Sequence, residues 1–190
     1  MARRKSVKSL IKELEPSELQ EVIVELCKLS KQNRQFLELY LVDSQPANPE
    51  LIVEEAKKKI YNQLYGRSLP KLDLRAARKV VNDYVKVLKE YPRSGAELKL
   101  YYVEVGTAIT DEFGDMYEGF YNSMESMFDS FCKDLKRNLS WYDYFIGRME
   151  HLRATTRHMG WGYADGIAEM IGEVEEELRR GEAGAVPRNA

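Results

Sequence analysis

The sequence has few of the residue types from which most metal sites and disulfide frameworks are built. Its 190 residues include only two cysteines and two histidines. Cys27 and Cys132 lie far apart, each among apolar neighbours, and two thiols without a suitably spaced histidine exclude a structural zinc site. Free, buried thiols in a reducing compartment are the default for such cysteines. The sequence therefore predicts free thiols and no metal site.

The sequence motifs of common enzyme classes and of membrane proteins are absent as well. There is no Gly-x-Ser-x-Gly, no phosphate-binding Gly-Lys-Ser/Thr loop and no His-Glu-x-x-His. No segment approaches the ~18–20 apolar residues that span a bilayer. Lys8 and Lys12 interrupt the segment after the basic N-terminus, which argues against a signal peptide. We therefore predict a cytoplasmic protein and nominate no catalytic, cofactor-binding or metal-binding residue.

Charged residues, in contrast, are abundant and nearly balanced in sign. The chain is 44% hydrophobic and 32% charged, which is typical of a globular protein with a charged surface. The net charge of −2 and the isoelectric point of about 5.9 give no support for a dedicated nucleic-acid-binding protein. The length predicts a single domain that is large enough for a proper core.

Apolar residues recur at intervals of three and four through almost the whole chain, which predicts helices. No alternating segment bounded by turn residues predicts a strand. The fold class is therefore all-α, with about nine helices. We place them at residues 6–13, 16–30, 32–42, 49–65, 74–91, 95–113, 116–138, 141–157 and 163–180.

Several of these helices have recognisable start signals. A proline at the first helical position costs no hydrogen bond, and side-chain oxygens accept hydrogen bonds from free amides of the first turn. Ser94 with Glu97, and Asp115 with Glu118, have the spacing of a capping box. The predicted start residues are Pro16, Pro49, Asp73, Ser94, Asp115 and Ser140.

The helix starts near residues 49, 95 and 141 have the spacing of two-helix repeats, roughly 40–47 residues. The residues within those helices do not resemble one another. Two architectures remain open: a curved stack of helical hairpins, like HEAT or armadillo proteins, and a closed irregular bundle. We expect one domain over residues 1–180 and a flexible C-terminal tail over residues 181–190, because Gly181 is placed to end the last helix.

Five segments together carry a resemblance to a known family. They are Asn48-Pro49-Glu50, Arg75-Ala76-Ala77-Arg78-Lys79, Leu98-Lys99-Leu100-Tyr101-Tyr102-Val103-Glu104, Phe113-Gly114-Asp115-Met116-Tyr117 and Gly160-Trp161-Gly162-Tyr163. In these segments the chain resembles a family of small bacterial cytosolic proteins that is catalogued only as a domain of unknown function. The resemblance covers about Leu10 to Leu178. It implies a helical bacterial protein and supplies no catalytic residues.

Acidic residues are concentrated in one interval of the chain. Between Lys99 and Lys133 there is no lysine or arginine. The interval holds Glu104, Asp111, Glu112, Asp115, Glu118, Glu125 and Asp129. One interpretation is an ordinary solvated face that also serves helix N-termini. The other is a docking surface for a basic segment, from this chain or from another.

Basic residues gather on the outer face predicted for the helix at 74–91. They are Arg75, Arg78, Lys79, Lys86 and Lys89. This face is either simply solvated or a binding surface for an anionic partner, which would be a nucleic acid or an acidic protein. The N-terminal residues Arg3, Arg4 and Lys5 add a basic arm.

A second basic group, Arg148, Arg153, Arg157 and His158, precedes two aromatic residues, Trp161 and Tyr163. Basic residues interleaved with aromatic ones bind phosphates and stack on bases. Trp161 between two glycines is also the pattern of a core residue at a close helix crossing, which is the interpretation that we favour.

The two histidines, His151 and His158, are seven residues apart and can share one helix face. With Asp165 they give a weak metal-site pattern, because neither the i,i+4 histidine spacing nor a third ligand on a neighbouring helix is evident. His158 at the end of its helix fits a capping role better.

These observations favour a non-catalytic protein-interaction or scaffold module. A nucleic-acid-associated helical protein is the alternative, and a metallo-enzyme based on the histidines is a third hypothesis. The partner is an unidentified protein, or a second copy of the chain if acidic and basic faces pair head to tail. The candidate interaction surface consists of Arg75, Arg78, Lys79, Lys86, Lys89, Glu118, Glu125, Asp129, Arg148, Arg157 and Trp161.

Overall fold

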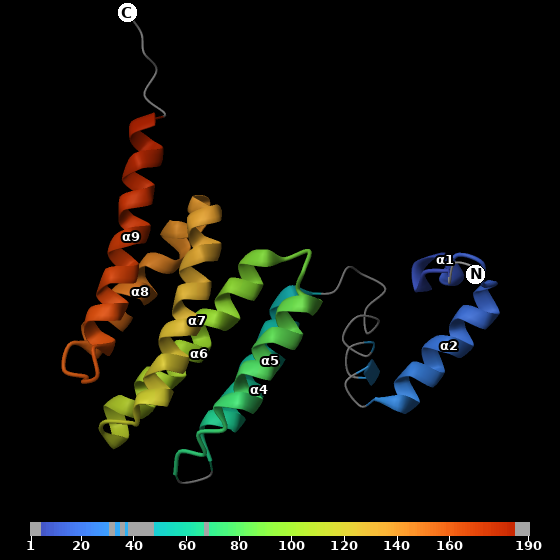
Figure 1. The fold of residues 1–190 in the computed structure, drawn as a ribbon, viewed down its shortest axis with the longest axis horizontal. Coiled ribbons are helices and arrows are strands. Elements are labelled where there is room, and N and C mark those ends of the chain that lie inside the picture. The colour runs from blue at the N-terminus through green and yellow to red at the C-terminus, as the bar shows by residue number, and fades with distance from the viewer. Residues whose placement is uncertain (1–4, 31–32, 35–36, 38–47, 67–68, 185–190) are drawn as a thin grey trace, which may run out of the picture. The chain divides into compact units, whose positions relative to one another are not determined.

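The protein is all-helical over the part of the chain that the computed structural model describes, residues 5–30, 33–34, 37, 48–66 and 69–184 (Figure 1). The elements are α1 (Val7–Ile11), α2 (Pro16–Leu29), α4 (Pro49–Leu64), α5 (Leu74–Val87), α6 (Pro92–Phe113), α7 (Glu118–Arg137), the 3-10 helix η1 (Leu139–Trp141), α8 (Tyr142–Thr156) and α9 (Tyr163–Gly184). The prediction of an all-α fold is confirmed. None of the helices described is long and apolar enough to cross a membrane.

The chain divides into two compact units, Met1–Asn48 and Pro49–Ala190, where the sequence predicts one domain over residues 1–180. The first unit contains α1 and α2, and neither helix buries a side chain. The second unit contains all the other named elements and, among the residues that the structure describes, every buried hydrophobic side chain. The predicted helix at 32–42 lies largely outside the described residues.

The second unit is a stack of three helical hairpins, α4–α5, α6–α7 and α8–α9 (Figure 1). The first helix of each hairpin contacts the first helix of the next, so α4, α6 and α8 form one layer. On the other side α7 contacts α9, and α5 contacts α6. Of the two architectures predicted, the helices of this unit follow the hairpin stack.

Helix α6 is the centre of the core because it is in contact with α4, α5, α7 and α8. Leu98, Leu100, Tyr102, Val103 and Ile109 are completely buried along it. Burial of each such side chain contributes about 1.5–3 kcal/mol to folding, so this helix contributes substantially to stability.

Three of the predicted helix starts are confirmed. Pro16 and Pro49 occupy the first positions of α2 and α4. Asp73 caps α5, because its carboxylate accepts a hydrogen bond from the amide of Ala76 at 3.0 Å. Start signals that depend only on neighbouring residues in the chain therefore predicted these three helix starts correctly.

The other three starts are wrong, and each has a physical reason. Helix α6 begins at Pro92, whose ring presets the helical φ, so Ser94 lies inside the first turn. Helix α7 begins at Glu118, and Asp115 instead accepts a hydrogen bond from the hydroxyl of Tyr121 at 2.7 Å. Ser140 lies within η1, so α8 begins at Tyr142.

The end of the last helix also differs from the prediction. Helix α9 continues past Gly181 to Gly184, so the predicted tail at 181–190 begins with helical residues. A glycine inside a helix costs only about 1 kcal/mol, which the rest of a 22-residue helix outweighs.

Candidate interaction surfaces

The basic face of α5 forms an open hollow of about 660 Å³ that Arg75, Arg78, Lys79 and Lys86 line together with Asp83. Asp83 forms ion pairs with Lys79 at 2.5 Å and with Lys86 at 3.8 Å, so it neutralises part of the positive charge. Arg75 has no polar partner among the residues described. The hollow is therefore cationic but partly compensated.

Arg78 does not lie free on the outer face of α5. Its Nη1 donates to the carbonyl of Ser123 at 2.8 Å, and its Nη2 donates to the hydroxyl of Ser126 at 3.3 Å. The guanidinium therefore ties α5 to α7. This position makes Arg78 a structural link between two hairpins more than a recognition residue.

A second hollow was not predicted from the sequence, and it lies where α5 ends and α6 begins. It has a volume of about 420 Å³ and is mainly apolar, with Val85, Leu88, Pro92, Gly95 and Trp141 in its wall. We call it the lysine-rimmed groove, because Lys86, Lys89 and Lys99 also line it. In the sequence, only the proline and the glycine near the start of α6 indicate that two helices approach closely there.

The three lysines at this groove differ in how strongly they are engaged. Lys99 is paired with Asp134 at 2.5 Å and is largely buried. Lys86 and Lys89 are 78% and 80% exposed, and their nearest carboxylates are 3.8 Å and 3.5 Å away. These two ammonium groups are therefore available to an anionic group of a partner.

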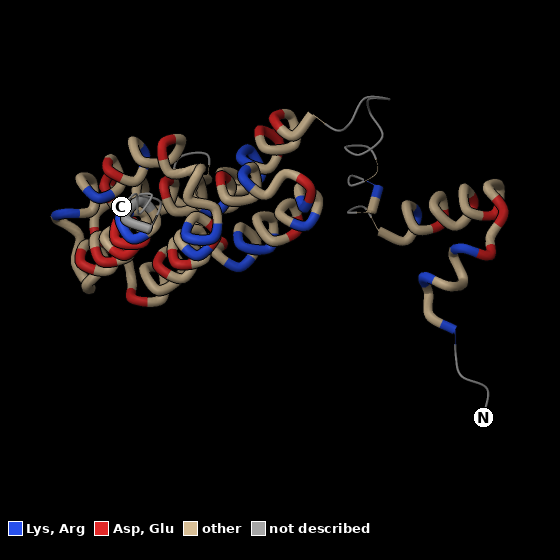
Figure 2. Tube along the Cα trace, turned by 90° about the horizontal axis from the view of Figure 1, so that it is seen from above, with Lys and Arg blue, Asp and Glu red and all other residues tan. Residues whose placement is uncertain are grey.

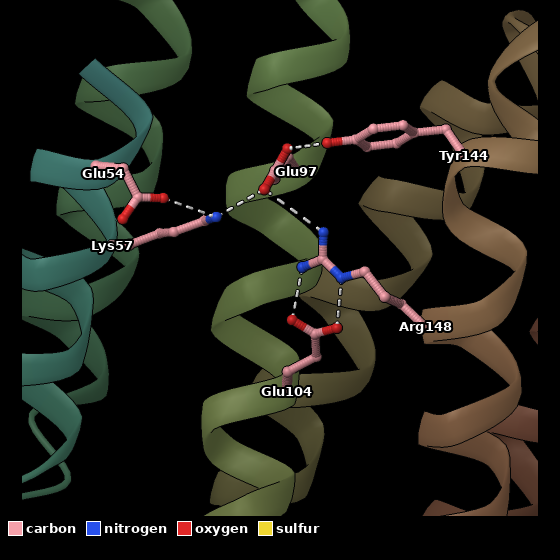
Figure 3. Close-up of polar contacts among 6 residues, drawn as sticks. All are labelled: Glu54, Lys57, Glu97, Glu104, Tyr144 and Arg148. Atoms are coloured by element: carbon pink, nitrogen blue, oxygen red, sulfur yellow. Dashed lines mark hydrogen bonds and ion pairs between the residues drawn. The ribbon is translucent and has the colours of Figure 1, made fainter. Parts of the chain in front are cut away.

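A polar network joins the three helices of the other layer, α4, α6 and α8 (Figure 3). Arg148 donates from Nε and Nη2 to the two carboxylate oxygens of Glu104, at 2.7 Å and 2.6 Å. The Nη1 of Arg148 lies 3.6 Å from Glu97, which also pairs with Lys57 at 2.7 Å. Tyr144 donates its hydroxyl to Glu97 at 2.9 Å. We call these five residues the ion-pair network.

Electrostatic effects show that the network stabilises its charged form. Partial burial alone would raise the pKa of Glu97, but hydrogen bonds from Lys57 and Tyr144 and the charge of Arg148 lower it below its ordinary value. Burial likewise opposes the charge of Lys57, but the hydrogen bonds to Glu97 and Glu54 leave its pKa raised. The network therefore holds the three hairpins together in their ionised state.

The acidic interval between Lys99 and Lys133 is not one continuous face. Glu104 belongs to the ion-pair network, and Asp129 pairs with Lys133 within α7 at 2.6 Å. Glu125 is half-buried, and this burial raises its pKa. Glu118 is exposed at the start of α7. Figure 2 shows acidic and basic segments interspersed along the helices of the second unit.

The predicted basic and aromatic patch of Arg148, Arg157 and Trp161 is not formed as a unit. Arg148 lies in the ion-pair network, whereas Arg157 is exposed at the end of α8. Trp161 is 63% exposed, so the favoured interpretation of this residue as part of the core is wrong. Tyr163, two residues later, is completely buried and takes that place.

The histidines do not come together with Asp165 into a metal site. No group of three or more potential metal ligands converges anywhere in the described ranges. The Nε2 of His158 lies 3.3 Å from Asp111 of α6, so it faces a carboxylate and not the carbonyls of its own helix.

Burial raises the pKa of the Cys132 thiol to about 12, so this cysteine stays protonated at neutral pH.

Helix α2 in the first unit carries an apolar ridge that is exposed to solvent. Val22, Leu26 and Leu29 are 42%, 46% and 81% exposed, and their spacing places them on one side of the helix. Glu18, Glu21 and Glu25 follow the same spacing and are exposed as well. An exposed apolar ridge beside acidic residues is typical of a helix that binds another protein surface.

Comparisons with known proteins add no assignment to these surfaces: no protein family, no curated protein and no solved structure matches the chain.

Proposed function

We propose that the chain is a non-catalytic protein-interaction module whose second unit binds an acidic amphipathic helix of a partner protein. The observation that carries this proposal is the lysine-rimmed groove between the end of α5 and the start of α6. The bacterial cytoplasm, which the family resemblance implies, is the proposed setting.

The chemistry of the groove supports this kind of partner. Its wall of Val85, Pro92 and Trp141 offers apolar surface to the apolar side chains of a helix. Its exposed rim residues Lys86 and Lys89 attract carboxylates on the flank of that helix. Tryptophan is among the residues that contribute most to binding energy at protein interfaces.

The ion-pair network supports the same function from the other layer of the stack. It joins α4, α6 and α8, so the hairpins keep a constant spacing. A rigid binding surface loses little conformational entropy when a partner binds, which favours affinity. A second copy of the chain is an alternative source of the partner helix, because α2 is both acidic and apolar on its exposed side.

The nucleic-acid alternative is supported by the hollow on α5, where Arg75 has no carboxylate partner in the part of the chain described. Phosphate contacts are strongest at low salt, so binding of single-stranded RNA at about 50 mM salt would support this alternative. We expect no such binding, because Asp83 lies in this hollow and pairs closely with Lys79, and Arg78 is engaged by α7. Fluorescence anisotropy of a labelled RNA measures it.

Two synthetic peptides of the same length test the favoured function. Both carry one leucine ridge at helical spacing, and they differ only in having glutamates or lysines along its flanks. We expect the full chain to bind the glutamate peptide at least about tenfold more tightly, because only this peptide complements Lys86 and Lys89. Isothermal titration calorimetry of both peptides gives the two affinities.

The Trp141 emission locates the binding site in the same experiment. In a Trp161→Asn background Trp141 is the remaining indole of the chain. Its emission should shift to shorter wavelength when the glutamate peptide covers the groove. Equal binding of both peptides in this Trp161→Asn background, or binding without any change in Trp141 emission, would refute the proposed function.

A further inference from the structure

The loop between α8 and α9 holds an unusual residue in an unusual conformation. The carbonyl of Gly160 accepts a hydrogen bond from the amide of Tyr163 at 3.1 Å, which closes a four-residue turn. The two central residues of this turn, Trp161 and Gly162, have φ angles of 60° and 74°. Positive φ at both central positions is the pattern of a type I′ turn, for which asparagine followed by glycine is preferred.

Trp161 is therefore a poor choice for the conformation that it adopts. A bulky residue at positive φ costs free energy that asparagine or glycine would largely avoid. Packing does not compensate this cost, because the indole is 63% exposed. Strained and exposed residues of this kind concentrate at functional sites. Neither the ion-pair network nor the lysine-rimmed groove includes Trp161.

The loop that carries Trp161 lies against an acidic segment of the chain, although Arg157 and His158 at the start of the loop are exposed as well. The amide of Gly160 donates to Asp115 at 3.4 Å, so this loop lies against the α6–α7 connection, and Figure 1 shows both at one edge of the second unit. Tyr117, two residues after Asp115, is 55% exposed. Exposed carboxylates are present at Asp111, Glu118 and Asp165.

We propose that this edge, which we call the turn edge, binds a lysine- or arginine-rich segment of a partner protein, with Trp161 as its anchor. We assign to the turn edge the exposed residues Trp161, Tyr117, Asp111, Glu118 and Asp165, which lie within five residues of the Gly160–Asp115 and His158–Asp111 contacts in the sequence. A cationic side chain over an indole or phenol ring gains a cation–π interaction, most strongly with tryptophan. The carboxylates supply complementary charge, and Glu118 and Asp165 have no ion-pair partner in the described part of the chain.

This surface is independent of the proposed function. The turn edge lies at the C-terminal end of α6, and the lysine-rimmed groove lies at its N-terminal end. The two surfaces also attract opposite charge. Charge reversal at Lys86 and Lys89 should therefore leave binding at the turn edge unchanged, so the two proposals can fail separately.

The decisive variant is Trp161→Asn in the full chain, because asparagine keeps the turn and removes the ring. The probe is a fluorescein-labelled hexa-arginine peptide, with hexa-glutamate as the matched control. We expect saturable binding of hexa-arginine only, weakened about tenfold or more by Trp161→Asn, as for an interface hot spot. The Glu118→Gln/Asp165→Asn double variant should weaken binding severalfold and lower its salt dependence. Trp141→Phe should leave it unchanged.

Stability distinguishes recognition from a structural role. If Trp161 serves only binding, Trp161→Asn removes backbone strain and raises the melting temperature or leaves it unchanged. A lower melting temperature would mean that the indole packs against the fold and would overturn the proposal. Unchanged affinity of Trp161→Asn for hexa-arginine, or equal binding of hexa-glutamate by the original chain, would overturn it as well.

Discussion

Replacing Phe131 by alanine is expected to lower the free energy of unfolding of the second unit by about 4 kcal/mol. The Phe131 ring is completely buried and joins α7 to α8. It lies edge-to-face with Phe145 at 5.1 Å and stacks on Phe128 at 5.7 Å. Alanine would remove both contacts and leave a cavity between two hairpins that rigid helices cannot close.

Phe113→Ala is the matched control for this substitution. Phe113 is also a helical phenylalanine with one aromatic neighbour, Tyr65 at 5.9 Å, but it is 39% exposed. Its loss should cost only about 1 kcal/mol. Urea unfolding followed by tryptophan fluorescence measures both variants, since both tryptophans belong to the second unit. Similar losses for the two variants would contradict the position of Phe131 in the core.

Replacing Arg148 by methionine is expected to cost about 2–3 kcal/mol of unfolding free energy. Arg148 makes two short hydrogen bonds to Glu104 and lies near Glu97. Without its charge, Glu104 loses its partner and Glu97 keeps only Lys57 as a cationic neighbour. The cost lies below that of a fully buried pair, because the side chain of Arg148 is 30% exposed and solvent screens its interactions.

Arg180→Met is the control, since Arg180 also approaches two carboxylates but is 70% exposed. It should cost less than about 1 kcal/mol. The pH dependence is a second check. The pKa of Glu97 is lowered in the folded state, so its stabilising effect is present above the pKa of the unfolded chain and is lost as the pH falls through the folded value. If Arg148→Met loses no more unfolding free energy in urea than Arg180→Met, the ion-pair network contributes little to stability.

Most of the fold could be predicted from the sequence because helical periodicity is a local property. Apolar residues such as Ile52, Ala56 and Ile60 have the spacing of one helix face, and they are buried on α4. Proline and aspartate at Pro49 and Asp73 marked helix starts correctly, because these signals depend only on neighbours in the chain.

The ion-pair network could not be predicted, because its members come from three helices that are distant in the sequence. Glu97 has the position of a capping-box residue relative to Ser94, but in the structure it pairs with Lys57. A carboxylate that satisfies two cations and a hydroxyl gains more than one that caps an amide. The local rule therefore failed where tertiary contacts offered a stronger interaction.

The candidate surfaces were predicted only in part. The basic face of α5 exists, but Arg78 is engaged by Ser123 and Ser126 of another hairpin. The flanking glycines of Trp161 indicate close packing and so predict a core residue, whereas in the structure Gly162 serves a turn with positive φ. The lysine-rimmed groove depends on how α5, α6 and η1 meet, which no single segment encodes.

The two proposed surfaces lie at opposite ends of the central helix of the second unit, and they attract partners of opposite charge. Helix α6 has 22 residues and thus a length of about 33 Å. Its first residue lines the lysine-rimmed groove, and its last turn contributes Asp111 to the turn edge. Two surfaces that attract partners of opposite charge are suited to holding two different partners, or to head-to-tail association of copies of the chain.

A charge-swap experiment tests the central claim most directly. The variant Lys86→Glu/Lys89→Glu changes two residues that are 78% and 80% exposed, so its fold should be unaffected. Calorimetry in the Trp161→Asn background, which removes the anchor of the turn edge, then compares its affinities for the glutamate-flanked and lysine-flanked peptides with those of the chain that keeps both lysines. Our account predicts that the preference reverses, so that the variant binds the lysine-flanked peptide more tightly. An unchanged preference, or loss of binding to both peptides with the fold intact, would contradict it.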